Sequence, residues 1–332
     1  KFTENLKLLL LSATPMFNSY KEVIWLLNLM NLNDNRFPIK ITEVFDKDGS
    51  FLLDDEGNEV GKELLIQKAR GYISFVRGEN PYTFPYRIYP SEFTAENLLK
   101  NMEYPRKQIN GMEIIRRIQF LDLFISNIGE YQERAYNYVI HQIQEDFPSF
   151  TKMESGVGYQ VLSNPLQILN MSYPSRKFDD GDKNIKLYGV GGLNRTMTYD
   201  KNTKRNFLYK QEVLDNYGKI FSNKEIFKYS GKIHSICEHI KKSKGIVLVY
   251  SAYLNGGCVP LALALEEMGL IRYGGRSLFK EQSSPRINAL TMESIKNSKE
   301  PVASYVMITG DQKLSPRNKD EIDWCTGEDN IN

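Results

Sequence analysis

Short runs of consecutive apolar residues recur along the chain and predict buried strands. Residues 8–11 are four consecutive leucines, and residues 246–251 read Ile-Val-Leu-Val-Tyr-Ser. Residues 303–311 combine another apolar run with a Gly-Asp turn. Runs of this length are typical of strands buried in a parallel sheet, and they are too short to span a membrane.

Other stretches have the composition and spacing of amphipathic helices, with apolar residues three or four positions apart. The helices that we expect cover residues 20–31, 62–72, 230–245 and 259–269, with one more in the second half of 110–145. Ser230 is a suitable N-cap, Pro260 is allowed in a first helical turn, and Gly269 is suited to end a helix.

The order of these elements predicts an α/β protein with two lobes. From residue 230 onwards helix, strand, helix and strand alternate, which is the order of a parallel sheet covered by helices. The aromatic stretch 71–90 contains three prolines, which force extended backbone and indicate a linker. Residues 34–61 predict a hairpin or excursion, and residues 146–225, rich in Gly, Ser, Asn and Asp, predict a long irregular insertion.

Length and charge limit the possible classes of function. The 332 residues exceed what one hydrophobic core usually holds, about 250 to 300. Lys and Arg number 43 against 41 Asp and Glu, so the whole chain is not strongly basic. Residues 195–244 hold twelve Lys or Arg against five Asp or Glu. Such an excess is usually a solvated face, and a phosphate-binding surface is the less common alternative.

The remaining composition adds little chemistry. Three widely spaced cysteines argue against a disulfide framework and favour a reducing compartment. Three histidines form no metal-ligand spacing, and His234 and His239 on the predicted helix 230–245 are expected at the surface. No signal peptide or long apolar run is present, which predicts an intracellular protein without a membrane span.

Hydroxyl groups follow the first two predicted strands, at the sheet edge where α/β proteins bind ligands. Ser12 and Thr14 follow the leucine run. From these residues alone, capping of the following turn is the better interpretation. Tyr250 and Ser251 end the second run and are candidate ligand-binding residues.

Glycines near the same edge would let backbone amides approach a phosphate closely. Gly256 and Gly257 follow the second predicted strand, and a tight strand-to-helix connection explains them equally well. Thr309 and Gly310 end the third predicted strand. Asp311 is better explained as a cap of a helix starting near residue 315.

These residues carry a resemblance to a known family. The sequence LLLSATPMFN followed by a helix resembles the Ser-Ala-Thr motif of superfamily-two helicases, in the form found in the Swi/Snf-type branch. RGENPYTFPYRIYP, YSAYLNGGCVPLALALEEMG and ITGD are most similar to helicase-like nucleoside triphosphatases of large cytoplasmic DNA viruses, a group that includes the poxvirus early transcription factor large subunit and nucleoside triphosphate phosphohydrolase. The match runs in order over most of the chain and is weakest in the insertion.

The resemblance implies parts of two RecA-like parallel-sheet lobes, with helical and irregular insertions. Residues 1–85 would end the first lobe with a helical or hairpin protrusion, and residues 86–332 would begin the second. Ser12, Ala13 and Thr14 would couple nucleotide state to the contact between the lobes. The resemblance implies nucleic-acid backbone contacts at Tyr250, Ser251, Gly256, Gly257, Thr309 and Gly310.

The chain departs from the family in its catalytic motifs. Neither G-x-x-x-x-G-K-[ST] nor Asp-Glu-x-His occurs in it, and the arginine-rich motif is also missing. We expect these motifs outside a central fragment, so no catalytic or metal-binding residue is predicted here. ATP and Mg²⁺ would be held by residues elsewhere, and this fragment alone is expected to be inactive.

Two classes of function remain open. The first is a nucleic-acid-dependent ATPase or helicase acting in viral transcription on DNA or RNA, with a viral RNA polymerase as a partner. The second is a catalytically silent, helicase-like binding or scaffold subunit of a virion or transcription complex. In both cases the resemblance implies a location in the virion and the viral factory of the host cytoplasm.

Overall fold

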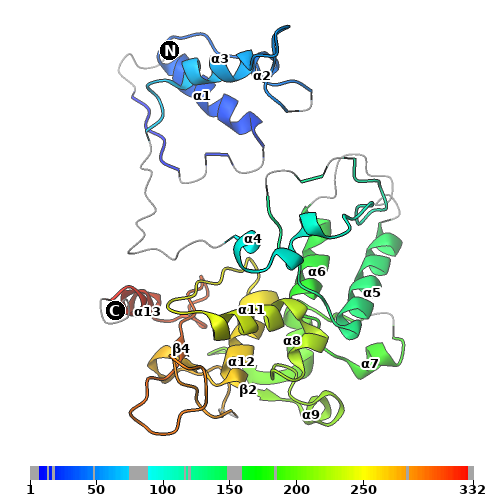
Figure 1. The fold of residues 1–332 in the computed structure, drawn as a ribbon. Helices are drawn as coiled ribbons and strands as arrows, with labels where there is room; N and C mark the ends of the chain where they lie inside the picture. The colour runs from blue at the N-terminus through cyan, green and yellow to red at the C-terminus, as the bar shows by residue number, and fades with distance from the viewer. Residues whose placement is uncertain are drawn as a thin grey trace. The chain divides into compact units, whose positions relative to one another are not determined.

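A computed structural model describes residues 7–12, 15–16, 19–47, 49–74, 89–115, 117–118, 121–147, 159–182, 185–281 and 284–327. The chain divides into two compact units, residues 1–80 and 81–332, which we call the first and the second unit (Figure 1). The expected lobe boundary between residues 85 and 86 lies outside the described residues. The identification of the two units as RecA-like lobes stays a prediction.

The described part of the first unit contains the helices α1 (Lys21–Asn33), α2 (Ile41–Val44) and α3 (Val60–Ala69). Ile24, Ile39, Val44 and Phe45 form its small core. The Asn28 side chain accepts a hydrogen bond from the amide of Ile39 and donates one to its carbonyl, both at 2.8 Å, which holds the return segment against α1. The expected helices 20–31 and 62–72 are confirmed with slightly shifted ends.

The expected buried strand at residues 8–11 is wrong for the described chain. These residues form no strand, and Leu9 and Leu11 are 80% and 86% exposed. A strand is stable only beside hydrogen-bonded neighbours, and the described residues of the first unit provide none here. Ser12 is exposed, while Ala13 and Thr14 lie outside the described residues, so the coupling motif stays a prediction.

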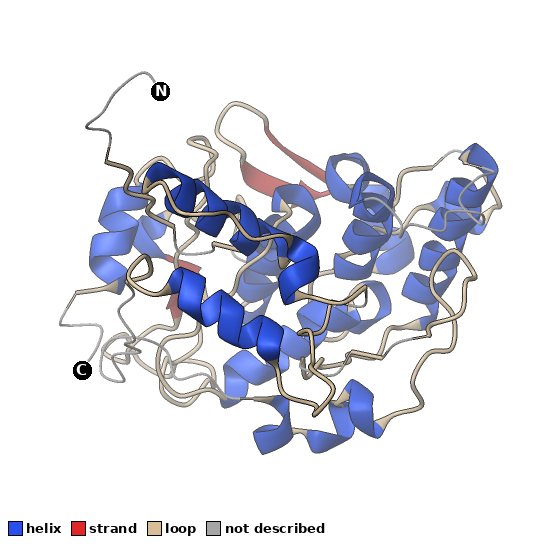
Figure 2. Cartoon of the chain, turned by 90° about the horizontal axis from the view of Figure 1, so that it is seen from above, coloured by secondary structure: helices blue, strands red, loops and turns tan. Residues whose placement is uncertain are grey.

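The second unit mixes many helices with short strands (Figures 1 and 2). Its α-helices are α4 (Pro90–Phe93), α5 (Glu130–Asp146), α6 (Tyr159–Asn170), α7 (Arg176–Asp179), α8 (Gly189–Thr196), α9 (Gln211–Tyr217), α10 (Ile226–Tyr229), α11 (Gly231–Lys242), α12 (Val259–Met268) and α13 (Asn318–Cys325). Its 3₁₀ turns are η1 (Ala95–Asn97), η2 (Leu99–Asn101) and η5 (Tyr273–Gly275), and the π-turn η4 (Leu254–Cys258) precedes α12.

Strand pairing in the described chain is limited to short ladders. Strands β1 (Met197–Asp200) and β2 (Arg205–Tyr209) form an antiparallel hairpin. Strands β3 (Ile271–Arg272) and β4 (Ser304–Tyr305) pair in parallel, Ile271 opposite Ser304. The parallel pair and the surrounding helices are compatible with the expected α/β class, although the sheet is much smaller than expected.

The expected irregular insertion at 146–225 is wrong for the part that the structure describes. Helices α6, α8 and α9 and the β1–β2 hairpin lie there (Figure 1). Tyr173, Leu193 and Phe207 are at most 1% exposed and belong to the main core, which also contains the apolar face of α12. The Gly and Asn content predicted a loop because local composition does not register this tertiary burial.

The helix ends follow the sequence rules closely. The Ser230 hydroxyl accepts a hydrogen bond from the Ile233 amide at 2.9 Å and caps α11. Pro260 lies in the first turn of α12, and Gly269 ends that helix with a φ of 107°. Both expected helices, 230–245 and 259–269, are confirmed, because caps and stops depend on neighbours in the sequence.

The expected buried strand at 246–251 is wrong in the same way as the first one. Residues 246–250 form no strand, and Leu248 and Tyr250 are 79% and 87% exposed. Their amides donate no hydrogen bond to a described residue. Apolar sequence alone does not produce a strand where no neighbouring strand completes the hydrogen bonds.

Candidate nucleic-acid interface

Two predicted site segments, far apart in the sequence, meet at one pocket of the second unit. The pocket is open, with a volume of about 670 Å³. Its lining comes from two chain segments and consists of Ser251, Ala252, Leu254, Cys258, Ile308, Thr309, Gly310 and Asp311. The structure therefore brings Ser251 together with Thr309 and Gly310, which the sequence could propose only as separate candidates.

One wall of the pocket is the turn between residue 251 and α12. The Ser251 hydroxyl donates to the Tyr253 carbonyl at 3.1 Å and accepts from the Tyr253 amide at 3.2 Å. The Tyr173 hydroxyl donates to the Asn255 carbonyl at 2.9 Å, and burial raises the pKa of Tyr173, so this donor stays protonated. The turn is held in place from behind by the core.

The two glycines of this turn are buried and are explained by packing. A Cβ on Gly257 would lie 2.1 Å from the Ser251 Oγ, and one on Gly256 would lie 3.0 Å from the Gln167 Oε1. Both positions therefore need glycine for the close approach of side chains within the protein. Their alternative interpretation, a tight connection, accounts for them in this structure, and neither glycine lines the pocket.

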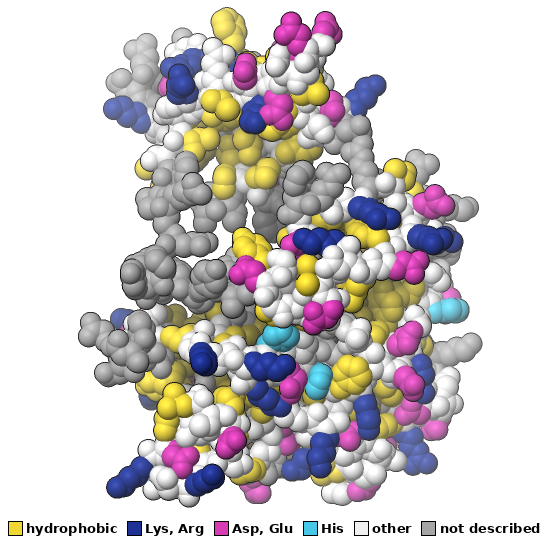
Figure 3. All heavy atoms as spheres, viewed as in Figure 1, with side chains coloured by type: hydrophobic (Ala, Val, Ile, Leu, Met, Phe, Trp, Pro, Cys, Tyr) yellow, Lys and Arg dark blue, Asp and Glu magenta, His cyan; other side chains and the backbone are white. Residues whose placement is uncertain are grey.

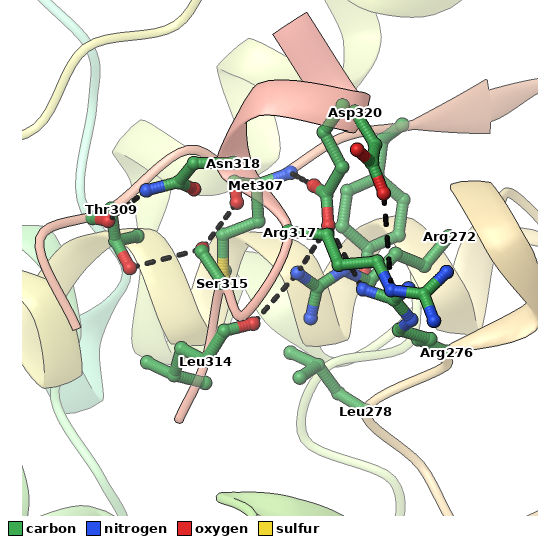
Figure 4. A network of polar contacts seen from close by, with 12 residues as sticks. Arg272, Arg276, Leu278, Met307, Thr309, Leu314, Ser315, Arg317, Asn318 and Asp320 are labelled. Carbon is green, nitrogen blue, oxygen red and sulfur yellow. Dashed lines mark hydrogen bonds and ion pairs between the residues drawn. The ribbon is translucent and has the colours of Figure 1, made fainter. Parts of the chain in front are cut away.

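The opposite wall is the turn 307–315, whose polar groups are tied together (Figure 4). The Thr309 Oγ1 lies 3.0 Å from the Ser315 Oγ and accepts from the Asp311 amide at 3.2 Å. The Asn318 side chain donates to the Thr309 carbonyl at 2.7 Å. These bonds fix the backbone on both sides of Gly310.

Gly310 itself is exposed at the pocket. A Cβ built there would meet no atom within 4 Å. The amides of Gly310 and Ala252 donate no hydrogen bond to any described residue. Two such backbone donors on the walls of one pocket can donate to a phosphate oxygen, which is the usual chemistry of backbone anion sites.

Asp311 forms an ion pair with Lys204 at the rim of the pocket, with side chains 20% and 28% exposed. This contact holds the pKa of the Asp311 carboxyl below its ordinary value near 3.8. The Asp311 Oδ1 also accepts from the Lys313 amide at 2.9 Å. Asp311 thus caps the turn 311–315, whereas α13 begins only at Asn318, so the expected helix start near residue 315 is wrong.

A buried ion pair supports the turn 307–315 from below (Figure 4). Arg272 is fully buried and donates through Nη2 to the Leu314 carbonyl at 2.7 Å and to the Glu321 Oε1 at 3.2 Å. The Glu321 Oε2 accepts from the Met307 amide at 3.1 Å. No local sequence pattern marks either member of this pair, because 49 residues separate them.

The sequence also predicted a contact at Tyr250. Tyr250 is exposed next to Ser251 but does not line the pocket.

On the face of the second unit drawn in Figure 3, Lys and Arg side chains alternate with Asp and Glu. Within 195–244, Lys228 pairs with Glu225 and Lys241 with Glu238, each at 2.6 Å, which favours the solvated-face interpretation.

The described residues offer neither a metal site nor a membrane span. No group of three or more His, Cys, Asp or Glu side chains among them could hold a metal ion. None of the described helices is long and apolar enough to cross a membrane.

The chain is similar to two proteins of Acanthamoeba polyphaga mimivirus. It is 23% identical over 299 residues to "Putative ATP-dependent RNA helicase L377", covering 82% of this chain and 23% of that protein. It is 23% identical over 271 residues to "Putative ATP-dependent RNA helicase R563", covering 80% of this chain and 35% of that protein.

The chain therefore spans between about a quarter and about a third of the length of these relatives. No protein-family profile matches the chain, and no solved structure matches it.

Proposed function

We propose that this chain is the central part of a nucleic-acid-dependent ATPase, a helicase-like motor. The observation that carries the proposal is the convergence of Ser251 with the Thr309–Gly310 turn on one open pocket with unpaired backbone amides. The similarity to two viral proteins named as ATP-dependent helicases supports the same class. The finer proposal is the Swi/Snf-type branch of large cytoplasmic DNA viruses.

The pocket would act by holding a phosphate of the nucleic-acid backbone. The Gly310 and Ala252 amides would donate to phosphate oxygens, and the absence of a side chain at Gly310 lets the strand come close. Backbone contacts carry no base readout, so binding would tolerate any sequence and weaken as salt rises. DNA and RNA both satisfy this chemistry.

The remaining parts of the motor belong to the proposal as well. ATP and Mg²⁺ would bind through residues outside this chain, between two RecA-like lobes formed in part by residues 1–85 and 86–332. Ser12, Ala13 and Thr14 would relay the nucleotide state to the facing lobe. The protein would act in viral transcription with an RNA polymerase, in the virion and in the host cytoplasm.

The test compares two substitutions that add the same charge at different places in the full-length protein. Gly310→Asp puts a carboxylate at the pocket, and Leu290→Asp puts one at a residue that is 84% exposed and does not line the pocket. We expect Gly310→Asp to weaken nucleic-acid binding about tenfold or more, because a like charge opposes the phosphate. ATPase activity without nucleic acid should stay unchanged in both variants.

Equal nucleic-acid binding by Gly310→Asp and the unsubstituted protein would overturn the pocket assignment. If the full-length protein binds nucleic acid but shows no ATPase activity under any condition, the motor is excluded and the scaffold alternative replaces it.

A further inference from the structure

A second pocket of the same unit lies in the segment where the helicase resemblance is weakest. It has a volume of about 280 Å³ and lies between the α7 region and helices α8 and α9. Three cationic side chains line it, Arg176, Lys177 and Arg195, together with the carboxylates of Asp182 and Glu212. Ligand pockets usually measure about 300 to 1,000 Å³, so this one suits a small molecule.

Arg195 is the central cation of this pocket. It is half-buried, and its Nη1 donates to the hydroxyl of the buried Ser175 at 3.3 Å. It forms no ion pair with any described residue. Partial burial of a guanidinium without a carboxylate partner costs free energy, and a bound anion would remove that cost.

Two more cations face the same space from α7. Lys177 is exposed and forms no ion pair with a described residue. Arg176 reaches Asp180 only at 4.0 Å, at the limit of an ion pair. The three cations in the lining outnumber its two carboxylates, Asp182 and Glu212, so the cations can act together on one anionic group.

The walls are held in place by a polar network behind them. The Tyr217 hydroxyl donates to Asp179 at 2.6 Å, and the Arg134 Nη2 donates to the same carboxylate at 2.6 Å. Burial raises the pKa of Tyr217, and the bond to Asp179 adds to this, so the hydroxyl stays a donor. The Ser175 amide donates to the Tyr131 hydroxyl at 3.0 Å. Fixed walls reduce the entropy cost of binding a ligand.

The carboxylates in the lining, Asp182 and Glu212, offer hydrogen-bond acceptors. Glu212 is exposed on α9 and forms no ion pair with a described residue. A carboxylate only accepts hydrogen bonds, so it suits the hydroxyl groups of a ligand and not its phosphate. A molecule that carries both a phosphate and hydroxyl groups suits a lining that contains both cations and carboxylates.

We propose that this pocket binds a small sugar phosphate, with the phosphate held by Arg195, Lys177 and Arg176 and the sugar hydroxyls by Glu212. This site is separate from the proposed nucleic-acid contact, and its occupant would be a metabolite or an effector of the protein.

Calorimetry on the full-length protein tests the proposal with ribose 5-phosphate and inorganic phosphate as probes. We expect one ribose 5-phosphate per chain. Arg195→Gln should weaken the binding of both probes about tenfold, because the phosphate loses one charge-assisted hydrogen-bonding partner. Glu212→Gln should weaken ribose 5-phosphate more than phosphate. Lys224→Gln, an exposed cation outside the pocket, is the matched control and should change neither affinity.

Further variants keep the test decisive. Lys177→Gln changes an exposed residue and should weaken both probes even if Arg195→Gln fails to fold. Gly310→Asp should leave the ribose 5-phosphate affinity unchanged, which separates this proposal from the proposed function. Absence of ribose 5-phosphate binding would refute the sugar-phosphate site. Equal affinity of the three pocket variants and the Lys224→Gln control for this probe would refute it as well. Displacement of the probe by a short single-stranded RNA would assign the pocket to nucleic acid and refute it too.

Discussion

The segment 246–250 and the turn 307–315 lead into the same pocket, yet they are held in opposite ways. The segment is apolar, but Leu248 is 79% exposed and no backbone amide of the segment bonds to a described residue. The turn is largely polar, but Leu314 and Ser315 are buried at 1% and 2% exposure within a connected network.

The difference shows that, for the two segments at this pocket, burial follows the supply of hydrogen-bonding partners and not hydropathy. The turn has Arg272, Glu321 and Asn318 to satisfy its backbone groups, so its polar residues can be buried. The segment 246–250 has no such neighbours among the described residues. The predictions below test this contrast, beginning with the strongest tie of the turn.

Arg272→Met removes the cation beneath the turn while leaving an apolar side chain of similar length. We expect a loss of about 3–5 kcal/mol in the free energy of unfolding, because buried Glu321 would keep only its longer contact to Arg276, at 3.9 Å. Urea unfolding followed by the fluorescence of Trp324 would measure the loss, with Trp25→Phe as background to remove the other tryptophan.

The matched control for this substitution lies just after the turn 307–315. Arg317 pairs with Asp320 at 3.8 Å with both side chains more than 60% exposed, so Arg317→Met should cost less than about 1 kcal/mol. Similar losses for Arg272→Met and Arg317→Met would mean that the buried pair does not support the turn.

Two glycine-to-alanine substitutions compare the two pocket walls by steric space alone. Gly257→Ala should cost about 1–3 kcal/mol, because its Cβ would lie 2.1 Å from the Ser251 Oγ and force the turn to move. Gly310→Ala should stay within about 0.5 kcal/mol, because its Cβ meets no atom. Thermal unfolding of both variants checks the pair, and equal stability would contradict the packing explanation of Gly257.

The sequence predicted the parts of this site that depend on neighbouring residues. The Ser230 cap, Pro260 and the left-handed Gly269 placed α11 and α12 correctly, since each acts within a turn or two of its own position. Ser251 and the Thr309–Gly310 turn were singled out for their place after apolar runs.

What the sequence could not predict depends on contacts between distant residues. The meeting of Ser251 with Thr309 joins segments that no local pattern connects. The burial of Tyr173 in an apparently irregular region, and the pair of Arg272 with Glu321, arise only from tertiary packing. The expected strands at 8–11 and 246–251 failed for the same reason, since a strand is defined by its neighbours, whereas the third apolar run does contain a strand, β4.

The ion pair of Lys204 and Asp311 stabilises the turn 307–315 less than the buried pair does, and its contribution depends on pH. Because the folded-state pKa of Asp311 is lowered, its contribution to stability is present above about pH 4 and is lost as the pH falls through the lowered value. Asp311→Asn should lower the free energy of unfolding by about 1 kcal/mol at neutral pH. The stability that the protein loses between neutral and acid pH should become smaller by the same amount. Urea unfolding between neutral and acid pH measures both, with the exposed Asp320→Asn as control. If Asp311→Asn loses as much stability on acidification as the unsubstituted protein, the ion pair does not stabilise the turn.

The smallest effect is expected in the exposed segment. Leu248→Ser should change the free energy of unfolding by less than about 0.5 kcal/mol, because the side chain is 79% exposed. The same substitution at the fully buried Leu263 should cost at least about 2–5 kcal/mol. Chemical unfolding of both variants provides the comparison. A loss above about 1 kcal/mol for Leu248→Ser would mean that residues 246–250 are packed against partners in solution, and they would then be held as the turn 307–315 is.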